Sequence, residues 1–333
     1  MRQAALLLLA ILLLQLPTIA QQQDLKNLDI NLENYKYPYP VQYLPLTIQK
    51  QNLRMAYMDV KPAKANGKTV MLLHGKNFNG AYWEQTADAL SRAGYRVIIP
   101  DQIGFGKSSK VTNIQYSFQL LAENTKAVLD KLGITKVNVL GHSMGGMLAT
   151  RFALMYPEVT EKLILENPIG LEDWKVVVPY QSVDDWYKNE LEQDYEKIKN
   201  YQLKFYYDGK WKPVYDKWVN ILAGWTLNKD YPIIAKNSAL TYDMIFTQPV
   251  CYEFENLTVP TLLIIGQRDR TALGKAKAPK EVQDDLGNYP KLGKLTAAKI
   301  KNSTLAEIDG IGHLPHIEAY ERFIEPLKDF LKK

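Results

Sequence analysis

The sequence is poor in the residues that build disulfide bonds, metal sites and low-complexity structures. Its 333 residues include a single cysteine, Cys251, and four histidines. One cysteine cannot form an internal disulfide, and there is no Cys cluster of the kind that binds zinc, so we expect no metal site. The 19 glycines and 17 prolines are too few for a collagen-like or low-complexity chain.

A large excess of one charge is also absent. The chain has 41 Lys and Arg against 36 Asp and Glu, a net charge of +5, and its basic residues are spread out rather than gathered in blocks. This pattern argues against nucleic acid as a partner. With 46% hydrophobic and 23% charged residues, the chain can bury a core and is not disordered.

Long hydrophobic runs are absent except near the N-terminus. Residues 4–14 form an apolar stretch that is too short to span a bilayer, which takes roughly 20 residues. Arg2 precedes this stretch, and the small residues Thr18 and Ala20 follow it. This order is typical of a signal peptide over residues 1–20. We therefore expect cleavage near Ala20, export to the periplasm or the exterior, and no stable membrane span afterwards.

Residues 21–45 are rich in Asn, Gln, Tyr and Pro. The run Tyr37-Pro38-Tyr39-Pro40 disfavours a regular helix or a central strand, because proline lacks the N–H that both need. This segment is predicted to be an extended arm that packs on the body of the protein through its tyrosines.

From residue 46 onwards, short β-branched apolar runs alternate with segments that carry apolar residues at helical spacing. Residues 46–60 fit two edge strands, and the runs that fit buried strands are 70–73, 97–99, 137–140, 163–165, 262–265 and 305–308. Helical spacing covers 83–93, 118–132 and 147–156. The alternation predicts an α/β fold with a mostly parallel central sheet flanked by helices. In such sheets, ligand chemistry gathers at the carboxyl ends of the strands.

One long segment, residues 168–260, lacks this alternation. It holds five of the six tryptophans and ten of the 21 tyrosines, mixed with charged residues at helical spacing. We expect an inserted helical cap over the strand ends, which divides the core into residues 46–167 and 261–333. The alternative is an ordinary helical subdomain whose aromatic residues form only its own core.

The run Gly141-His142-Ser143-Met144-Gly145-Gly146 connects a predicted strand to a predicted helix. It fits the pattern G-x-S-x-G, in which a serine hydroxyl stands exposed on a sharp strand-to-helix turn. Gly141 and Gly145 lack side chains where the strand and the helix crowd together. Ser143 is therefore predicted to be a nucleophile. The alternative is a serine in a glycine-rich turn without a chemical role.

A serine hydroxyl is a weak nucleophile and needs a base. His142 adjoins Ser143 on the same turn, which directs its side chain away, and His74 ends a strand and is expected to brace a loop. His313 lies in a glycine-flanked loop after the last strand and is the predicted base. His316 is expected to be structural or to form a pocket wall, and it is the alternative base.

The base needs a carboxylate that orients it and stabilises its charged form. Asp269 follows the predicted strand 262–265, and the order Ser143, Asp269, His313 is one of the known chain orders of a serine triad. Glu166, at the end of the strand 163–165, is the alternative acid.

The negative charge that develops on the substrate oxygen needs two donors. The backbone N–H groups of Met144 and Lys76 are predicted to supply them, because Met144 follows the nucleophile and Lys76 lies in the loop after His74-Gly75. The residues predicted to line a pocket are Asn77, His142, Trp174, Tyr242 and His316.

These segments together resemble the α/β-hydrolase fold family over nearly all of residues 46–331. The matching segments are LLHGKNFNG at 72–80, PDQIGFGKSS at 100–109, GHSMGG at 141–146, GQRDR at 266–270 and GHLPHIE at 312–318. The chain looks most like the capped group of esterases, carbon–carbon bond hydrolases, epoxide hydrolases and haloalkane dehalogenases. Ser143 stands where the last two carry Asp, which disfavours their chemistry. Residues 74–77 lack the extra glycines typical of carbon–carbon hydrolases and prolyl aminopeptidases.

The resemblance implies a serine hydrolase that needs no cofactor, and the pattern of residues 1–20 predicts that it is exported. The leading hypothesis is cleavage of a small-molecule apolar or aromatic carboxylic ester through an acyl-enzyme. The alternative is carbon–carbon bond hydrolysis of ring-cleavage diketones by the same triad, and a non-catalytic binding protein on this fold is a third reading. The sequence carries no indication of the oligomeric state.

Overall fold

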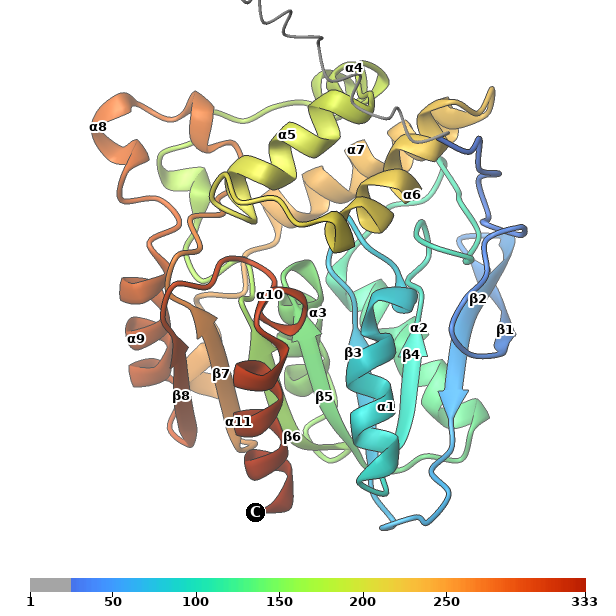
Figure 1. Ribbon diagram of the computed structural model, residues 1–333, viewed down its shortest axis with the longest axis vertical. Helices are drawn as coiled ribbons and strands as arrows, with labels where there is room; N and C mark the ends of the chain where they lie inside the picture. Colours follow the sequence, from blue (N-terminus) through green and yellow to red (C-terminus); the bar gives the residue numbers. More distant parts are fainter. Residues whose placement is uncertain (1–24) are drawn as a thin grey trace, which may run out of the picture.

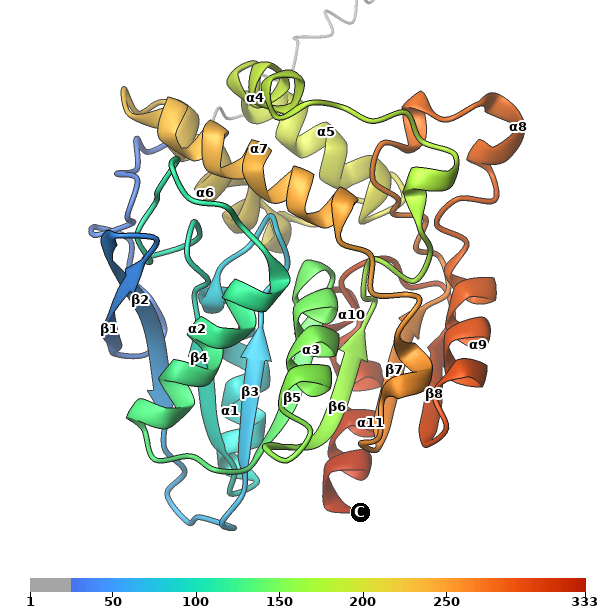
Figure 2. The same ribbon diagram turned by 180° about the vertical axis from the view of Figure 1, so that it is seen from behind.

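The computed structural model describes residues 25–333. The predicted signal peptide and the first residues of the predicted arm lie outside the described residues. Within the described part, a central sheet is flanked by helices on both faces, and a group of further helices lies across one end of the sheet (Figures 1 and 2).

Eight strands form one sheet in the order β1-β2-β4-β3-β5-β6-β7-β8. The strands are β1 Val41–Ile48, β2 Gln51–Val60, β3 Thr69–Leu73, β4 Arg96–Pro100, β5 Val137–His142, β6 Thr160–Glu166, β7 Thr261–Gly266 and β8 Ser303–Ile308. The pairs β1–β2 and β2–β4 are antiparallel, and the other pairs are parallel. The prediction of a mostly parallel α/β sheet is confirmed.

Helices cover both faces of this sheet. They are α1 Glu84–Arg92, α2 Phe118–Lys131, α3 Met144–Met155, α9 Tyr289–Lys299 and α11 Tyr320–Lys332. Two short helices, α8 Lys280–Gln283 and α10 Pro315–Glu318, lie in the segments that follow β7 and β8. α1 and α11 pack on one face, and α2, α3 and α9 pack on the other (Figures 1 and 2). Residues 70–73 of β3 are all apolar because both sides of this strand are buried. Val70 and Leu72 join the core under α1 and α11, while Met71 and Leu73 join the core under α2 and α3.

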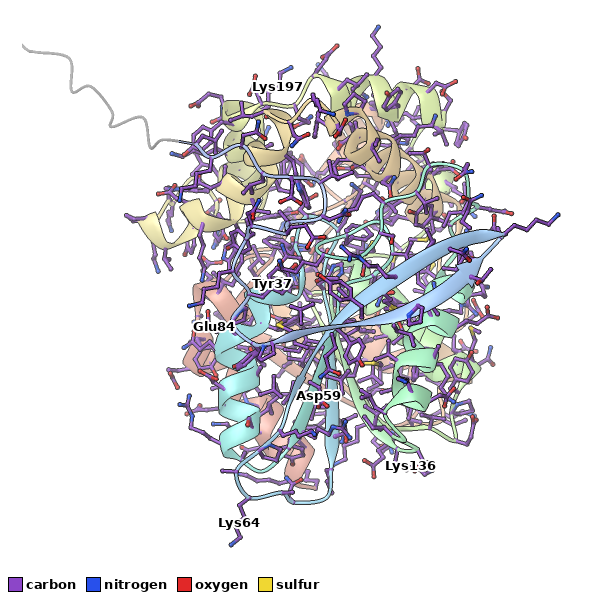
Figure 3. The ribbon with its side chains drawn as sticks, turned by 90° about the vertical axis from the view of Figure 1, so that its right-hand side faces the viewer. Tyr37, Asp59, Lys64, Glu84, Lys136 and Lys197 are labelled. Atoms are coloured by element: carbon purple, nitrogen blue, oxygen red, sulfur yellow. The ribbon has the colours of Figure 1, made fainter. Side chains whose placement is uncertain are left out.

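The N-terminal arm is shorter than the sequence predicted. β1 begins at Val41, so residues 41–45 belong to the sheet, and Pro45 is accommodated because β1 is an edge strand. Tyr37 lies against the body of the protein (Figure 3), where its hydroxyl donates to Asp101 Oδ2 at 2.7 Å. The arm is therefore fixed by tyrosine hydrogen bonds, in the manner expected from its composition.

Residues 168–260, called the helical insertion below, contain no strand. Their main helices are α4 Val183–Leu191, α5 Tyr195–Phe205, α6 Asp216–Thr226 and α7 Tyr231–Thr247. α4 packs on α7 and α5 packs on α6. All four lie beyond the carboxyl ends of β3, β5 and β6 (Figures 1 and 2). The predicted site residues lie in the loops that follow these strand ends. Among residues 25–333, no helix combines the length and apolar character required to cross a membrane.

The turn between β5 and α3 leaves no space for a side chain at Gly145. A Cβ added there would lie 2.2 Å from the carbonyl oxygen of Leu73 in β3. We expect Gly145→Ala to lower the free energy of unfolding by about 3 kcal/mol, because the backbone of β3 or α3 must shift. Thermal unfolding followed by circular dichroism measures this loss.

Gly293→Ala in α9 is the matched control. A Cβ at Gly293 meets only the Ile265 side chain, at 3.1 Å, and alanine favours a helix over glycine. Its free energy of unfolding should therefore change by less than about 1 kcal/mol. Equal stability of Gly145→Ala and the wild type would contradict the packing described for this turn.

Candidate active site

Ser143 occupies a strained backbone conformation between β5 and α3. Its φ is 57° and its ψ is −121°, a region that residues other than glycine rarely adopt. Its N–H donates to the Glu166 carbonyl at 3.2 Å, and its carbonyl accepts from the Gly146 N–H at 2.9 Å. A Cβ on Gly141 would lie 2.0 Å from the Gly145 oxygen, so the two glycines allow the chain to turn this sharply.

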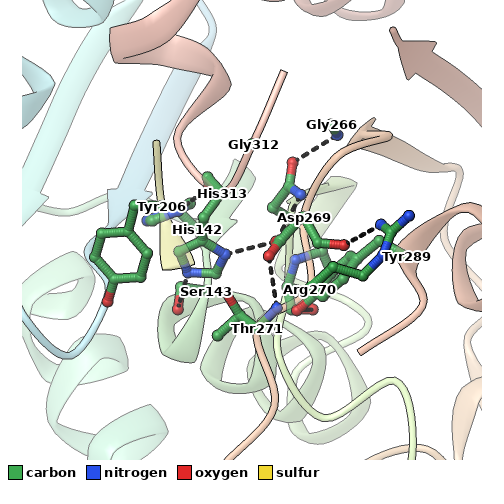
Figure 4. A network of polar contacts seen from close by, with 12 residues as sticks. His142, Ser143, Tyr206, Gly266, Asp269, Arg270, Thr271, Tyr289, Gly312 and His313 are labelled. Carbon is green, nitrogen blue, oxygen red and sulfur yellow. Dashed lines mark hydrogen bonds and ion pairs between the residues drawn. The ribbon is translucent and has the colours of Figure 1, made fainter. Parts of the chain in front are cut away.

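The three residues predicted as nucleophile, base and acid form one chain of hydrogen bonds (Figure 4). Ser143 Oγ lies 2.9 Å from His313 Nε2, and His313 Nδ1 lies 2.6 Å from Asp269 Oδ2. The side chains come from the carboxyl ends of β5, β7 and β8. All three are buried, and Ser143 is the most accessible at 7%. The geometry is that of a nucleophile, a base and an orienting carboxylate.

Donors around Asp269 keep this carboxylate ionised. Oδ1 accepts from the Thr271 N–H at 2.8 Å, and Oδ2 accepts from Asn167 Nδ2 at 2.8 Å. Burial acts to raise the pKa of Asp269, but the charge and hydrogen bond of His313 and the hydrogen bonds of Thr271 leave that pKa below its usual value. The sequence reasoning missed Asn167, which also accepts the Gly266 N–H and so connects β6 to the acid loop.

Contacts on both sides of His313 fix the loop that carries it. The Gly312 N–H donates to Glu318 Oε2 at 2.8 Å, and Glu318 also pairs with Arg268 from the acid loop. On the other side, His142 Nε2 lies 2.8 Å from the His313 carbonyl oxygen. The base loop is therefore tied to the acid loop and to the nucleophile turn.

His142 is a buried link beneath the nucleophile. Burial and the neighbouring His313 and His316 lower its pKa well below the usual value, so the ring is neutral. Its Nε2–H donates to His313, and its Nδ1 accepts from the Tyr82 hydroxyl at 3.1 Å; that hydroxyl in turn accepts the Gly75 N–H at 2.9 Å. The side chain points away from Ser143 Oγ as expected, but it is fully buried, so its prediction as a pocket residue is wrong.

Glu166 and His316 form a separate buried pair. Glu166 Oε1 accepts from the His316 N–H at 2.9 Å and lies 2.8 Å from His316 Nδ1. The His316 ring stacks on Trp83 with centroids 4.4 Å apart. Neither side chain contacts Ser143 or His313. This geometry therefore excludes Glu166 as the acid and His316 as the base of the triad. His316 has a structural position, and its prediction as a pocket residue is wrong.

The loop after β3 packs directly against the nucleophile. A Cβ on Gly75 would lie 3.1 Å from Ser143 Cβ. Among the described residues, the backbone N–H groups of Lys76 and Met144 donate to no other group. Both are therefore free to bind a substrate oxygen beside Ser143, which is the role the sequence predicts for them.

A cavity of about 240 Å³ lies between this loop and the helical insertion. Asn77 and Tyr242 line it, as predicted. Trp174 does not line it, because it is 4% exposed and packs in the core cluster that contains α2 and α3. Its prediction as a pocket residue is wrong. The remaining walls include charged and amide side chains from α4 and α5 as well as aromatic residues from α6 and α7.

Tyr206 is a residue of this site that the sequence reasoning missed. Its ring stacks on His313 (Figure 4), with centroids 4.8 Å apart and planes inclined by 22°. Its hydroxyl accepts from Asn77 Nδ2 at 2.9 Å. Ser143 and His313 are not among the residues that line the cavity. In this conformation Tyr206 and Asn77 therefore lie between the cavity and the triad.

Within residues 25–333, no three His, Cys, Asp or Glu side chains are grouped closely enough to hold a metal ion. The single cysteine, Cys251, is buried and free.

One pair of variants tests whether Asp269 or Glu166 is the acid of the triad. Asp269→Asn should slow the labelling of Ser143 by a fluorophosphonate about 10³-fold or more, because an amide does not hold His313 in the tautomer that accepts the serine proton. Labelling followed over time by intact mass measures the rate and needs no knowledge of the substrate.

Glu166→Gln is the control, because it keeps an oxygen acceptor for the His316 N–H. It should lower the melting temperature through the loss of a charge-assisted hydrogen bond and change the labelling rate by less than about tenfold. Slow labelling of Glu166→Gln together with normal labelling of Asp269→Asn would contradict the geometry above.

Comparison with known proteins agrees with this fold. A family model described as the alpha/beta hydrolase fold matches residues 68–320. A 2-hydroxy-6-oxononadienedioate/2-hydroxy-6-oxononatrienedioate hydrolase of Comamonas testosteroni is 32% identical over 183 residues, which are 53% of this chain and 64% of that protein. A 2-hydroxy-6-oxo-6-phenylhexa-2,4-dienoate hydrolase of Burkholderia cepacia is 38% identical over 129 residues, 38% of this chain and 45% of that protein. The chain thus matches less than two thirds of the length of these curated relatives.

A solved structure matches over a larger share of the chain. The crystal structure of a "probable hydrolytic enzyme" from Pseudomonas aeruginosa PAO1 has a TM-score of 0.91 and 54% sequence identity, and the match covers 93% of this chain and 99% of that one. The extent of the family match and of this structural match leads to one conclusion. The chain belongs to the alpha/beta hydrolase fold family.

Proposed function

We propose that the protein is a serine hydrolase in which Ser143 attacks a carbonyl carbon. The observation that carries this proposal is the hydrogen-bonded chain from Asp269 through His313 to Ser143. Membership of the alpha/beta hydrolase fold family supports it, because the nucleophile turn, the acid loop and the base loop occur in the order that this fold uses.

In the first step, His313 Nε2 accepts the Ser143 proton while the serine oxygen bonds to the substrate carbonyl. The ionised Asp269 stabilises the imidazolium that forms. The N–H groups of Lys76 and Met144 hold the oxyanion, and each such donor typically contributes about 3 kcal/mol to the barrier reduction. His313 then gives its proton to the leaving group, and a water molecule activated by His313 releases the acyl group from Ser143.

For the bond that is cleaved, the relatives favour the carbon–carbon reading over the ester reading. The curated relatives from Comamonas and Burkholderia are named as hydrolases of 2-hydroxy-6-oxo dienoates. On such a substrate, the leaving group would be a carbon atom conjugated to an enol. The proton from His313 would go to that carbon, and water would supply the hydroxyl of the acid product.

Cleavage of a carboxylic ester is the second candidate. The observation that favours it is the loop His74-Gly75-Lys76-Asn77, which lacks the extra glycines typical of carbon–carbon hydrolases. The same triad serves both bonds, and an alcohol leaving group accepts the proton of His313 on oxygen. We also propose export, which is expected from residues 1–20 and fits this candidate. A small-molecule substrate that is apolar or aromatic is proposed as well.

The nucleophile and the bond can be tested together. Ser143→Ala should reduce kcat by about 10⁴-fold or more on every substrate that the wild type turns over, because no other side chain replaces the serine oxygen. The measurements are p-nitrophenol release from acyl esters of increasing length and loss of the yellow colour of 2-hydroxy-6-oxo-6-phenylhexa-2,4-dienoate.

The substrate with the higher kcat/KM decides the bond. Faster turnover of the dienoate would establish carbon–carbon hydrolysis, and faster turnover of an ester would establish the second candidate. If Ser143→Ala and the wild type turned over these substrates equally, the proposed function would be wrong.

A further inference from the structure

The imidazole of His313 uses its edge for the triad and leaves its faces for packing. Nε2 and Nδ1 bond in the plane of the ring, so the contacts with Ser143 and Asp269 both run along that edge. Tyr206 lies on a face instead, with the ring centroids 4.8 Å apart and the planes inclined by 22° (Figure 4). Tyr206 can therefore stay on the ring while His313 accepts and donates a proton.

The Tyr206 side chain is held in this position from several sides. Its hydroxyl accepts from Asn77 Nδ2 at 2.9 Å, and the Tyr201 ring packs edge-on against it with centroids 5.5 Å apart. Its backbone follows α5 and lies against the base loop, since a Cβ on Gly312 would be 2.2 Å from the Tyr206 carbonyl oxygen. These contacts fix both ends of the residue, which is 4% exposed.

The face of the Tyr206 ring is suited to a positive charge. An aromatic ring carries negative potential on its face and attracts a cation placed there. His313 becomes such a cation when it takes the proton of Ser143, and Asp269 stabilises that cation only from the edge. Burial raises the pKa of Tyr206 well above its usual value, so the phenol stays neutral and acts through its ring. Because His313 is 1% exposed, little water competes with this contact.

We propose that Tyr206 is a positioning residue of the reaction. Its ring keeps the His313 imidazole in the plane that meets both Ser143 and Asp269, and its face stabilises the imidazolium that forms in each proton transfer. This inference rests on the proposed function, whichever bond is cleaved. It gives the turn after α5, which belongs to the helical insertion, a task in the chemistry of the triad.

The test measures how fast a fluorophosphonate labels Ser143 as the pH is varied. Tyr206→Leu removes the aromatic face but keeps an apolar side chain over His313. Its rate at high pH should fall by about fivefold or more, and the pH of half-maximal rate should fall by about half a unit or more, because the imidazolium loses a stabilising contact. A loss of orientation alone would lower the rate without moving the half-maximal pH.

Tyr206→Phe is the conservative variant, because it keeps the aromatic face and loses only the hydroxyl that bonds to Asn77. It should recover most of the rate and return the half-maximal pH to within about 0.2 unit of the wild type. Equal profiles for Tyr206→Leu and Tyr206→Phe would overturn the proposal. Faster labelling of Tyr206→Leu than of the wild type would also overturn it, since Tyr206 would then be a barrier in front of Ser143.

Tyr207→Leu is the matched control, because it makes the same change at the next residue. Tyr207 is fully buried and stacks on Tyr215, with centroids 3.8 Å apart, and not on His313. Its loss should lower the melting temperature through the cavity that it leaves, without a shift of the half-maximal pH. A shift as large as that of Tyr206→Leu would show an effect of the whole insertion and would overturn the proposal.

The other charged and titratable groups around His313 are the same in all these proteins. They are His142 at the end of β5, Tyr201 on α5, Arg268 and Asp269 in the acid loop, and His316 and Glu318 on α10. A difference between the pH profiles therefore reports the side chain at position 206.

Proton NMR separates this proposal from the proposed function. The chain has four histidines, so the Cε1–H signal of His313 can be identified by its absence in His313→Gln. The pH midpoint of its titration should be lower in Tyr206→Leu than in the wild type and restored in Tyr206→Phe, even if no fluorophosphonate labelled the protein. An equal midpoint in all three proteins would overturn the proposal even if Ser143 were labelled.

Discussion

The backbone of Ser143 is the constraint on which the rest of the site depends. A φ of 57° at a residue with a side chain costs about 1–3 kcal/mol, and the structure holds it with hydrogen bonds to Glu166 and Gly146. The strain is useful because it projects Oγ clear of β5 and leaves the Met144 N–H at the start of α3 free. Gly141 and Gly145 have to be glycines because the strand, the helix and β3 approach one another closely at this turn.

The loops around Ser143 are cross-connected so that they hold one arrangement. Asn167 joins β6 to the acid loop, and the Arg268–Glu318 pair joins the acid loop to the base loop. Beneath the nucleophile, Tyr82 and His142 link the loop after β3 to the His313 carbonyl. Because these contacts are buried or partly buried, the donors and the base are positioned before a substrate arrives, which is the condition for electrostatic stabilisation of a transition state.

Local motifs carried the part of this site that could be predicted from sequence. Ser143 sits in a pattern whose glycines and flanking elements are read directly, and Asp269 and His313 follow strands in a recognisable order. Asn167 and Tyr206 could not be found in this way, because their roles come from packing between segments far apart in the chain. Trp174 shows the same limit. The aromatic composition of residues 168–260 suggested that Trp174 forms a cavity wall, but the fold places it in a core cluster. Likewise, the edge position that admits Pro45 into β1 is a property of the sheet and not of the local sequence.

The most direct test of a nucleophilic Ser143 is to trap the covalent intermediate. Turnover of a p-nitrophenyl acyl ester by the wild type is stopped with acid within the first turnovers, and the digested protein is mapped by mass spectrometry. The predicted result is the mass of the acyl group on the peptide that contains Ser143, with no acyl group in a sample of Ser143→Ala treated in the same way. Acylation of a different residue, or steady turnover in the wild type without any acylated peptide, would contradict a nucleophilic Ser143.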